Sequence, residues 1–235
     1  MQGTFKRYEK KYIITKEQFS ILEPYINKHM IGGKYGKYMV QNIYYDTKTW
    51  DVVQRSIEKP HYKEKMRVRC YGIPKPTDNI FVELKKKYAG IVYKRRITTS
   101  YSNLNKLKSV LLIEGSQISK ELSYYMQHTN VDRMMYISYL RQEFAGKEDV
   151  DLRITFDRDV TYRLDTLDFN SPQKGKKILP DIKILMEVKT HTAYPLWLAQ
   201  VFSNNKIFSS SFSKYGASYL DYIHYDNESE VKRFA

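Results

Sequence analysis

The sequence predicts a mainly antiparallel protein of the α+β class, with helices flanking its strands. Several segments alternate apolar with charged residues, the period of a strand that has two different faces. Gly, Pro, Asn and Asp gather between these segments and predict loops at 32–36, 71–79 and 167–177. No repeat or linker divides the 235 residues, so we expect a single domain over 1–235.

The alternation is clearest in segment 65–71, where Met66, Val68 and Cys70 share one predicted face. The same pattern predicts strands near 80–87, 150–157 and 181–189. Their apolar faces hold Ile80, Val82, Leu84, Leu152, Ile154, Phe156, Ile182, Ile184, Met186 and Val188. The first strand, 5–12, places Tyr8 and Tyr12 opposite its charged residues.

Helices are predicted by apolar residues at helical spacing. Thr15 can cap a helix that carries Phe19, Leu22 and Ile26, and similar spacing occurs near 47–57, 103–113 and 195–203. The C-terminal stretch 221–235 fits either a terminal helix or a frayed tail.

The composition points to a polyanionic partner. There are 40 Lys and Arg residues against 26 Asp and Glu, a formal net charge of +14, so nucleic acid, an anionic membrane and polyphosphate all qualify. The single cysteine excludes an internal disulfide, and the first residues lack an apolar signal segment, so we expect a cytoplasmic location. No apolar run approaches the roughly 20 residues of a membrane span, so membrane association would need a partner protein or a surface patch.

The charged strand faces carry more cations than acids. A solvated face is the ordinary explanation of a charged strand face, but it normally mixes both signs. The cations are Arg7, Lys11, Lys65, Arg67, Arg69, Lys85, Lys94, Arg96, Arg141, Arg153 and Lys189, and the acids are chiefly Glu9, Glu83 and Glu187, with Glu143 and Asp157 on the same parity. If these cations were enclosed without a ligand, their desolvation and mutual repulsion would cost roughly several kcal/mol each. An enclosed cationic face therefore implies a bound polyanion.

A run of phosphates suits this mixture, because arginine binds phosphate oxygens in pairs and lysine adds a mobile charge. The glutamates could hold Mg²⁺ or Mn²⁺, or could simply pair with neighbouring lysines. The five histidines lack metal-ligand spacing, Cys70 lies on an apolar face as a structural thiol, and there is no GxxxxGK[ST] phosphate loop. Most of the 22 tyrosines are expected in strands and core, with Tyr44 and Tyr45 as candidates for lining a nucleotide entrance.

Together these segments resemble a known family. The matching motifs are RYEKKY (7–12), YYDT (44–47), KMRVRCYG (65–72), VELKKK (82–87), YKRR (93–96), YLRQEF (139–144), LRITFD (152–157), MEVKT (186–190) and FSKY (212–215). Their order and spacing resemble the triphosphate tunnel metalloenzyme superfamily, and more closely its vacuolar transporter chaperone branch, the polyphosphate polymerase domain. The resemblance implies an eight-stranded closed β-barrel lined with basic residues and acidic metal ligands.

Site residues follow from the resemblance motif by motif. It implies catalytic contacts to phosphate for Lys11, Arg67, Arg69, Lys85, Lys94, Arg141, Arg153 and Lys214. Further substrate contacts are expected of Arg7, Lys65, Arg96, Lys189 and Tyr44, and metal binding of Glu187, Glu9 and Glu83. The superfamily's first strand reads ExExK, whereas here Arg7 replaces the first acid, which favours the polymerase branch over a thiamine triphosphatase or adenylate cyclase.

We therefore expect the protein to be a polymerase that uses ATP and Mn²⁺ or Mg²⁺ to extend polyphosphate. Two alternatives remain open from the sequence. The first is a hydrolase of inorganic or nucleoside triphosphates. The second is a noncatalytic module that binds polyphosphate or nucleic acid.

Overall fold

The computed structural model describes residues 8–58, 60–89, 91–171 and 173–234, with side chains as far as residue 224. Arg7, a predicted substrate contact, lies outside the described residues.

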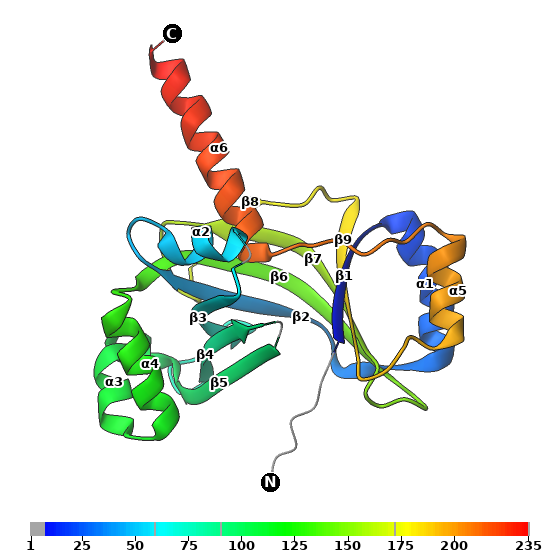
Figure 1. Cartoon of the computed structure of the whole chain (residues 1–235), viewed down its shortest axis with the longest axis horizontal. Helices are drawn as coiled ribbons and strands as arrows, with labels where there is room; N and C mark the ends of the chain where they lie inside the picture. The colour runs from blue at the N-terminus through cyan, green and yellow to red at the C-terminus, as the bar shows by residue number, and fades with distance from the viewer. Residues whose placement is uncertain (1–7, 59, 90, 172, 235) are drawn as a thin grey trace. The chain divides into compact units, whose positions relative to one another are not determined.

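One antiparallel sheet runs through the chain (Figure 1). Its strand order is β1-β9-β7-β6-β2-β3-β4-β5, with β8 paired to β7. The strands are β1 (Tyr8–Thr15), β2 (Met30–Asp46), β3 (Tyr62–Tyr71), β4 (Asn79–Tyr88), β5 (Ile91–Ser100), β6 (Asp132–Gly146), β7 (Arg153–Arg163), β8 (Lys176–Lys177) and β9 (Lys183–Thr190). The predicted α+β class with mainly antiparallel strands is confirmed.

The prediction of a closed barrel is wrong. Within the described ranges, β1 pairs with β9 and β5 with β4, and the sheet ends at these two strands instead of joining them. Alternation reports which face of a strand is apolar, whereas closure depends on the stagger of the first and last strands, a long-range property. Lys94, Arg95 and Arg96 also give β5 the charge that is typical of an exposed edge strand.

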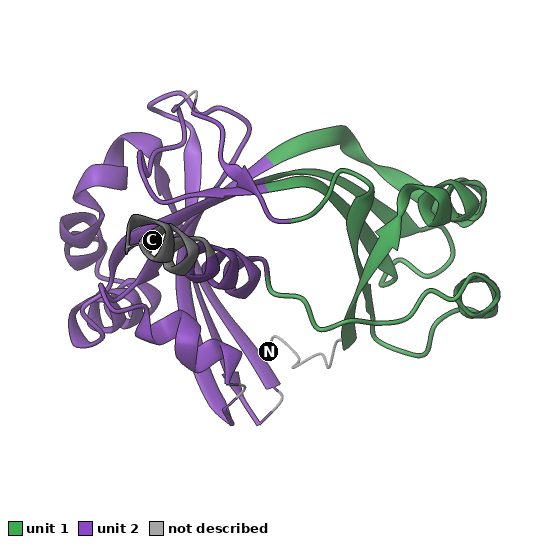
Figure 2. Cartoon of the chain, turned by 90° about the horizontal axis from the view of Figure 1, so that it is seen from above, with its two compact units in different colours: residues 1–39, 139–160, 179–213 green, residues 40–138, 161–178, 214–235 purple. Residues whose placement is uncertain are grey.

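The chain divides into two compact units, each assembled from three stretches (Figure 2). Unit 1 comprises residues 1–39, 139–160 and 179–213, and unit 2 comprises 40–138, 161–178 and 214–235. Strands β2, β6 and β7 contribute residues to both units, and each unit has its own hydrophobic core. The single domain over 1–235 stays a prediction.

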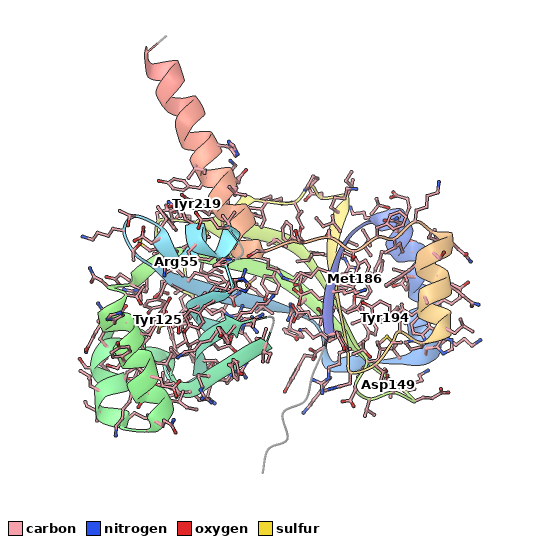
Figure 3. The ribbon with its side chains drawn as sticks, viewed as in Figure 1. Arg55, Tyr125, Asp149, Met186, Tyr194 and Tyr219 are labelled. Carbon is pink, nitrogen blue, oxygen red and sulfur yellow. The ribbon has the colours of Figure 1, made fainter. Side chains whose placement is uncertain are left out.

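The core of unit 1 packs helices α1 (Lys16–His29) and α5 (Leu196–Asn204) with β1, β7 and β9. Phe19 of α1 meets Phe156 of β7 edge to face, with ring centroids 4.9 Å apart. Met186, labelled in Figure 3, is fully buried on β9. The predicted apolar faces of β7 and β9 are confirmed except at Ile182, which precedes β9 and is 57 % exposed.

The core of unit 2 contains the predicted apolar faces of β3 and β4, and they are confirmed. Its helices are α2 (Asp51–Ile57), the 3-10 helix η1 (Tyr101–Lys106), α3 (Leu107–Glu114), α4 (Gln117–His128) and α6 (Lys214–Phe234). Helix α4 is not among the predicted helices, and α6 shows that the C-terminal stretch is a helix and not a frayed tail. Among the described helices, none has both the length and the apolar character for a membrane span.

The predicted loop at 32–36 is wrong, because β2 runs through it. Gly33 packs closely against β6: a Cβ at this position would lie 2.6 Å from Cγ of Glu143 and would displace that side chain. Glycine in a strand can mark such a close approach as well as a turn, and the sequence does not separate the two.

The cap of α1 generates a stability prediction. Thr15 accepts a hydrogen bond from the Gln18 amide, and the Gln18 side chain accepts one from the Thr15 amide. Thr15→Ala should therefore lower the free energy of unfolding by about 1 kcal/mol in urea titrations. The control is Ser20→Ala, which removes only an exposed bond within the same helix and should change stability by less than about 0.5 kcal/mol. Equal losses in the two variants would contradict the capping role.

Candidate functional site

The cationic residues of unit 2 lie in three consecutive rows across β3, β4 and β5. Lys65 is opposite Lys85, and Lys85 is opposite Lys94. The next rows are Arg67, Glu83 and Arg96, and then Arg69, Phe81 and Thr98. We call these residues, with Tyr44 beside Arg67 on β2, the Glu83 cluster. All lie on the strand face opposite the buried core residues of the same strands.

Glu83 is the centre of this cluster and is 2 % exposed. Its Oε2 accepts from Arg67 Nε at 2.8 Å and lies 2.7 Å from Arg67 Nη2. Its Oε1 accepts from Arg96 Nε at 2.8 Å and also pairs with Arg96 Nη2. Both oxygens are therefore engaged by guanidinium groups, which gives Glu83 a positioning role and makes it a poor donor for a metal.

The electrostatics of Glu83 follow from this contact. Burial raises the pKa of its carboxyl, but Arg67 and Arg69 and the hydrogen bonds from Arg96 and Arg67 outweigh burial and lower the pKa to about 2. The Glu83 carboxylate is therefore ionised in the folded protein at neutral pH.

Asn42 and Tyr44 orient two arginines of this face. Arg69 is 7 % exposed and donates from Nε to Asn42 Oδ1 at 3.0 Å. Tyr44 is 5 % exposed and accepts from Arg67 Nη1 at 3.2 Å. Burial raises the pKa of Tyr44, but Arg67 and Lys65 lower it to about 8. The buried ring favours a role in orienting Arg67 over the predicted role at a nucleotide entrance.

Lys214 is the first residue of α6 and belongs to unit 2. Its side chain is buried, at 8 % exposure, which is unusual for lysine. The next residue, Tyr215, stacks on Tyr44 with ring centroids 4.4 Å apart. The sequence motif FSKY thus reaches the Glu83 cluster through Tyr215.

Unit 1 holds a second group around Glu187, which we call the Glu187 cluster: Lys11, Arg141, Asp157, Glu187 and Lys189. Register places Lys11 of β1 opposite Glu187 of β9. Glu187 makes long ion pairs with Lys189 at 3.6 Å, Lys11 at 3.9 Å and Arg141 at 4.0 Å.

Asp157 is the acid that the sequence analysis underrated. It is fully buried and accepts two bonds from Arg141, at 2.7 and 2.8 Å. Burial lowers the pKa of Arg141, but Tyr139, Asp157 and Glu187 raise it well above its ordinary value, so the guanidinium stays charged. In the sequence, only the position of Asp157 on the charged face of its strand indicated a role in the site. Its bond to Arg141 could not be predicted, because that bond depends on strand order.

Two predicted residues lie beside this cluster. Arg153 is opposite Lys189, which is opposite Glu9. Arg153 and Glu9 are both exposed, and Glu9 pairs with Lys189 at 4.0 Å.

Lys11 also donates to the carbonyl of Phe212 at 2.8 Å, and its own carbonyl accepts from the Ser210 amide at 2.7 Å. These bonds tie the segment before α6 to β1 within unit 1.

The donor set can be tested against a divalent metal. In the part of the chain that the structure describes, no group of three or more His, Cys, Asp or Glu side chains could hold an ion. Mg²⁺ usually binds through one or two carboxylates and completes its shell with phosphate oxygens and water. Glu187 offers one such carboxylate, and Asp157 already engages Arg141 at short range.

The predicted structural role of Cys70 agrees with its surroundings. The residue is 1 % exposed, and burial raises the pKa of its thiol to about 11. A thiol protonated at neutral pH is a poor nucleophile.

A family model for the VTC domain matches residues 6–222 of the 235. The chain belongs to the VTC domain family. The predicted resemblance to the vacuolar transporter chaperone branch is therefore confirmed for the domain, and polymerase activity stays a prediction. A comparison with curated proteins gives no match.

Solved structures show similar folds at low sequence identity. A Hippeastrum protein, described as a candidate adenylyl cyclase with a dominant triphosphatase activity, is 13 % identical with a TM-score of 0.52, over 92 % of this chain and 96 % of that chain. A candidate adenylate cyclase from Vibrio parahaemolyticus is 15 % identical with a TM-score of 0.47, over 92 % and 98 %. Another from Bacillus halodurans is 12 % identical with a TM-score of 0.49, over 87 % and 92 %. The Hippeastrum likeness supports the fold of this VTC domain.

The depressed pKa of Glu83 generates a pH prediction. Because the pKa is about 2 in the folded protein against an ordinary 4.5, the ionised carboxylate stabilises the fold above about pH 4.5. This contribution should be lost as the pH falls from 4.5 towards 2. Glu83→Gln should lower the free energy of unfolding by about 3 kcal/mol at pH 7 and flatten the acid dependence, both measurable by urea unfolding at several pH values.

The matched control is Glu64→Gln on β3, the strand paired with β4. Glu64 pairs with Lys86 at 3.4 Å at a more exposed position, so its loss should cost under about 1 kcal/mol. An unchanged acid profile in Glu83→Gln would show that Glu83 is not held as described.

Proposed function

We propose that this VTC domain is a divalent-metal-dependent polyphosphate polymerase that transfers the γ-phosphate of ATP to a growing polyphosphate chain. Membership of the family supports the class of activity, and the two cationic clusters contain guanidinium and ammonium groups of the kind that bind phosphate. ATP and polyphosphate are the proposed ligands.

The row Lys65, Lys85 and Lys94 is the observation that carries the proposal. Directly opposed residues on antiparallel strands have Cβ atoms about 5 Å apart, and like charges there destabilise a sheet. Here the like charges continue across three strands and lie beside Arg67 and Arg96. A phosphate chain on this face would place negative charge along the whole row, which a single carboxylate would not.

The proposed chemistry needs positioned charge more than a covalent protein nucleophile. An oxygen of the terminal phosphate of the chain attacks the γ-phosphorus of ATP, the bond from that phosphorus to the β–γ bridging oxygen breaks, and ADP leaves. Arg67, Arg69 and Arg96 would hold nonbridging oxygens, and the lysine row would neutralise negative charge. Lys11, Arg141, Arg153 and Lys189 would bind phosphates in unit 1.

Glu187 would hold the metal, with Glu9 as the second predicted carboxylate. When bound, Mn²⁺ or Mg²⁺ neutralises phosphate charge and polarises phosphoryl oxygens. Lys11 and Lys189 would orient the Glu187 carboxylate, because both lie within 4 Å of its oxygens.

Triphosphate hydrolysis is the second candidate. The Hippeastrum structure with the similar fold is described as having triphosphatase activity, although 13 % identity supports the fold alone. The same groups would bind the triphosphate, and water would replace the phosphate acceptor. The two candidates therefore differ in product and share the phosphate-binding residues.

Incubation of the protein with ATP and Mn²⁺ should give chains of polyphosphate on a stained gel, with ADP formed in parallel. Free phosphate without chains would support the triphosphatase. If neither product formed, a noncatalytic binding module would be the remaining interpretation.

Arg67→Ala should reduce turnover by about 100-fold or more, because one fixed donor to a developing charge is lost. Undiminished activity in Arg67→Ala would contradict this site assignment.

Neighbouring residues of β5 give a matched test of the face. Arg96 belongs to the Glu83 cluster, whereas Arg95 points to the other face and pairs with Glu121 of α4 at 3.2 Å. Arg96→Ala should weaken tripolyphosphate binding about tenfold by calorimetry, because one charge-assisted contact is lost. Arg95→Ala should stay within about twofold, and equal effects would show that the phosphates do not bind on this face.

A further inference from the structure

The start of α6 is anchored to unit 2 by Tyr215, which the sequence analysis did not single out. The residue is 2 % exposed, stacks on Tyr44 with an interplanar angle of 10°, and donates its hydroxyl to Asp46 Oδ2 at 2.6 Å. Burial and the Asp46 charge raise the pKa of Tyr215, so its hydroxyl keeps the proton that it donates. Figure 3 shows Tyr219 one turn further along α6, where its hydroxyl accepts from Gln54 of α2 at 2.8 Å.

Asp46 connects three elements through one carboxylate. Its Oδ1 accepts from the amides of Thr47 at 2.8 Å and Val52 at 2.9 Å, and its Oδ2 accepts from Val53 at 3.0 Å. It is fully buried at the end of β2. Since the backbone of α2 fixes this carboxylate, Asp46 is a rigid acceptor for Tyr215.

Contacts continue from Tyr215 to the Glu83 cluster. Tyr44, on which Tyr215 stacks, accepts from Arg67, and the Arg67 guanidinium lies 5.9 Å from the centre of the Tyr44 ring. The residue before Tyr215 is Lys214, whose carbonyl accepts from Ser218 Oγ at 2.9 Å. The backbone of Lys214 is thus fixed by the first turn of α6 on one side and by Tyr215 on the other.

We propose that Tyr215, held by Asp46 and stacked on Tyr44, is a positioning residue that fixes Lys214 at the Glu83 cluster for binding a phosphate chain. The role of Lys214 rests on the proposed function, and the roles of Tyr215 and Asp46 rest on the contacts above. A lysine side chain has many rotamers, so a fixed backbone and a buried stem increase the fraction of molecules in which the ammonium group is in place.

A double-mutant cycle tests this role, with tripolyphosphate as the probe and calorimetry as the measurement. Tyr215→Phe keeps the stacked ring and removes only the bond to Asp46, and should raise Kd about fivefold. Lys214→Ala should raise Kd about tenfold. The double variant should bind no more weakly than Lys214→Ala, because Tyr215 acts through Lys214. Additive losses would show that Tyr215 supports binding only through general structure and would overturn the proposal.

Tyr101→Phe is the matched control. Tyr101 also belongs to unit 2 and donates to an aspartate, Asp168, at the same distance of 2.6 Å. Its loss should lower the melting temperature by a similar amount and leave Kd for tripolyphosphate unchanged. An equal rise of Kd in Tyr101→Phe would also contradict the proposal.

Chemical labelling separates this inference from the proposed function. Acetic anhydride on the native protein, read by mass spectrometry, should modify Lys214 several-fold faster in Tyr215→Phe than in the wild type or in Tyr101→Phe. If the wild type fails to bind tripolyphosphate but shows this difference, the proposed function is wrong and the positioning of Lys214 stands. If the reactivity of Lys214 is the same in all three proteins, Tyr215 does not position Lys214.

Discussion

The carboxylate of Glu83 between Arg67 and Arg96 is the contact on which the cationic face of unit 2 depends. Two guanidinium groups on strands either side of β4 would repel each other, and the buried carboxylate engages both. Each arginine is thereby held in one orientation before any ligand binds, which lowers the entropy lost on binding. The buried carboxylate therefore stabilises this cationic face in the absence of a ligand.

Unit 1 uses a similar device with a different division of roles. Asp157 engages Arg141 at 2.7 Å, whereas Glu187 lies 3.6 to 4.0 Å from Lys189, Lys11 and Arg141. Asp157 therefore positions one arginine, and Glu187 lies among three cations. The difference is geometric, since both acids lie on the charged faces of neighbouring strands.

Aromatic residues organise polar ones in unit 2. Tyr44 orients Arg67 and receives the ring of Tyr215, which in turn reaches Asp46 and the start of α2. Tyrosine suits this position because its ring packs in the core while its hydroxyl completes a hydrogen bond. The prediction that most tyrosines are strand and core residues applies to Tyr44 and Tyr215, and their contacts also connect α6 to the cationic face of unit 2.

The sequence by itself determined the faces of the strands. Met66 and Val68 are buried and Arg67 lies opposite them because side chains alternate strictly along an extended chain, a local property. The tertiary structure decided which residues meet. Lys11 lies opposite Glu187, and Lys65 opposite Lys85, because of strand order and register. The open ends at β1 and β5, the close approach at Gly33 and the bond from Tyr215 to Asp46 have the same origin. These features depend on contacts between residues far apart in the chain, whose energies a local pattern does not contain.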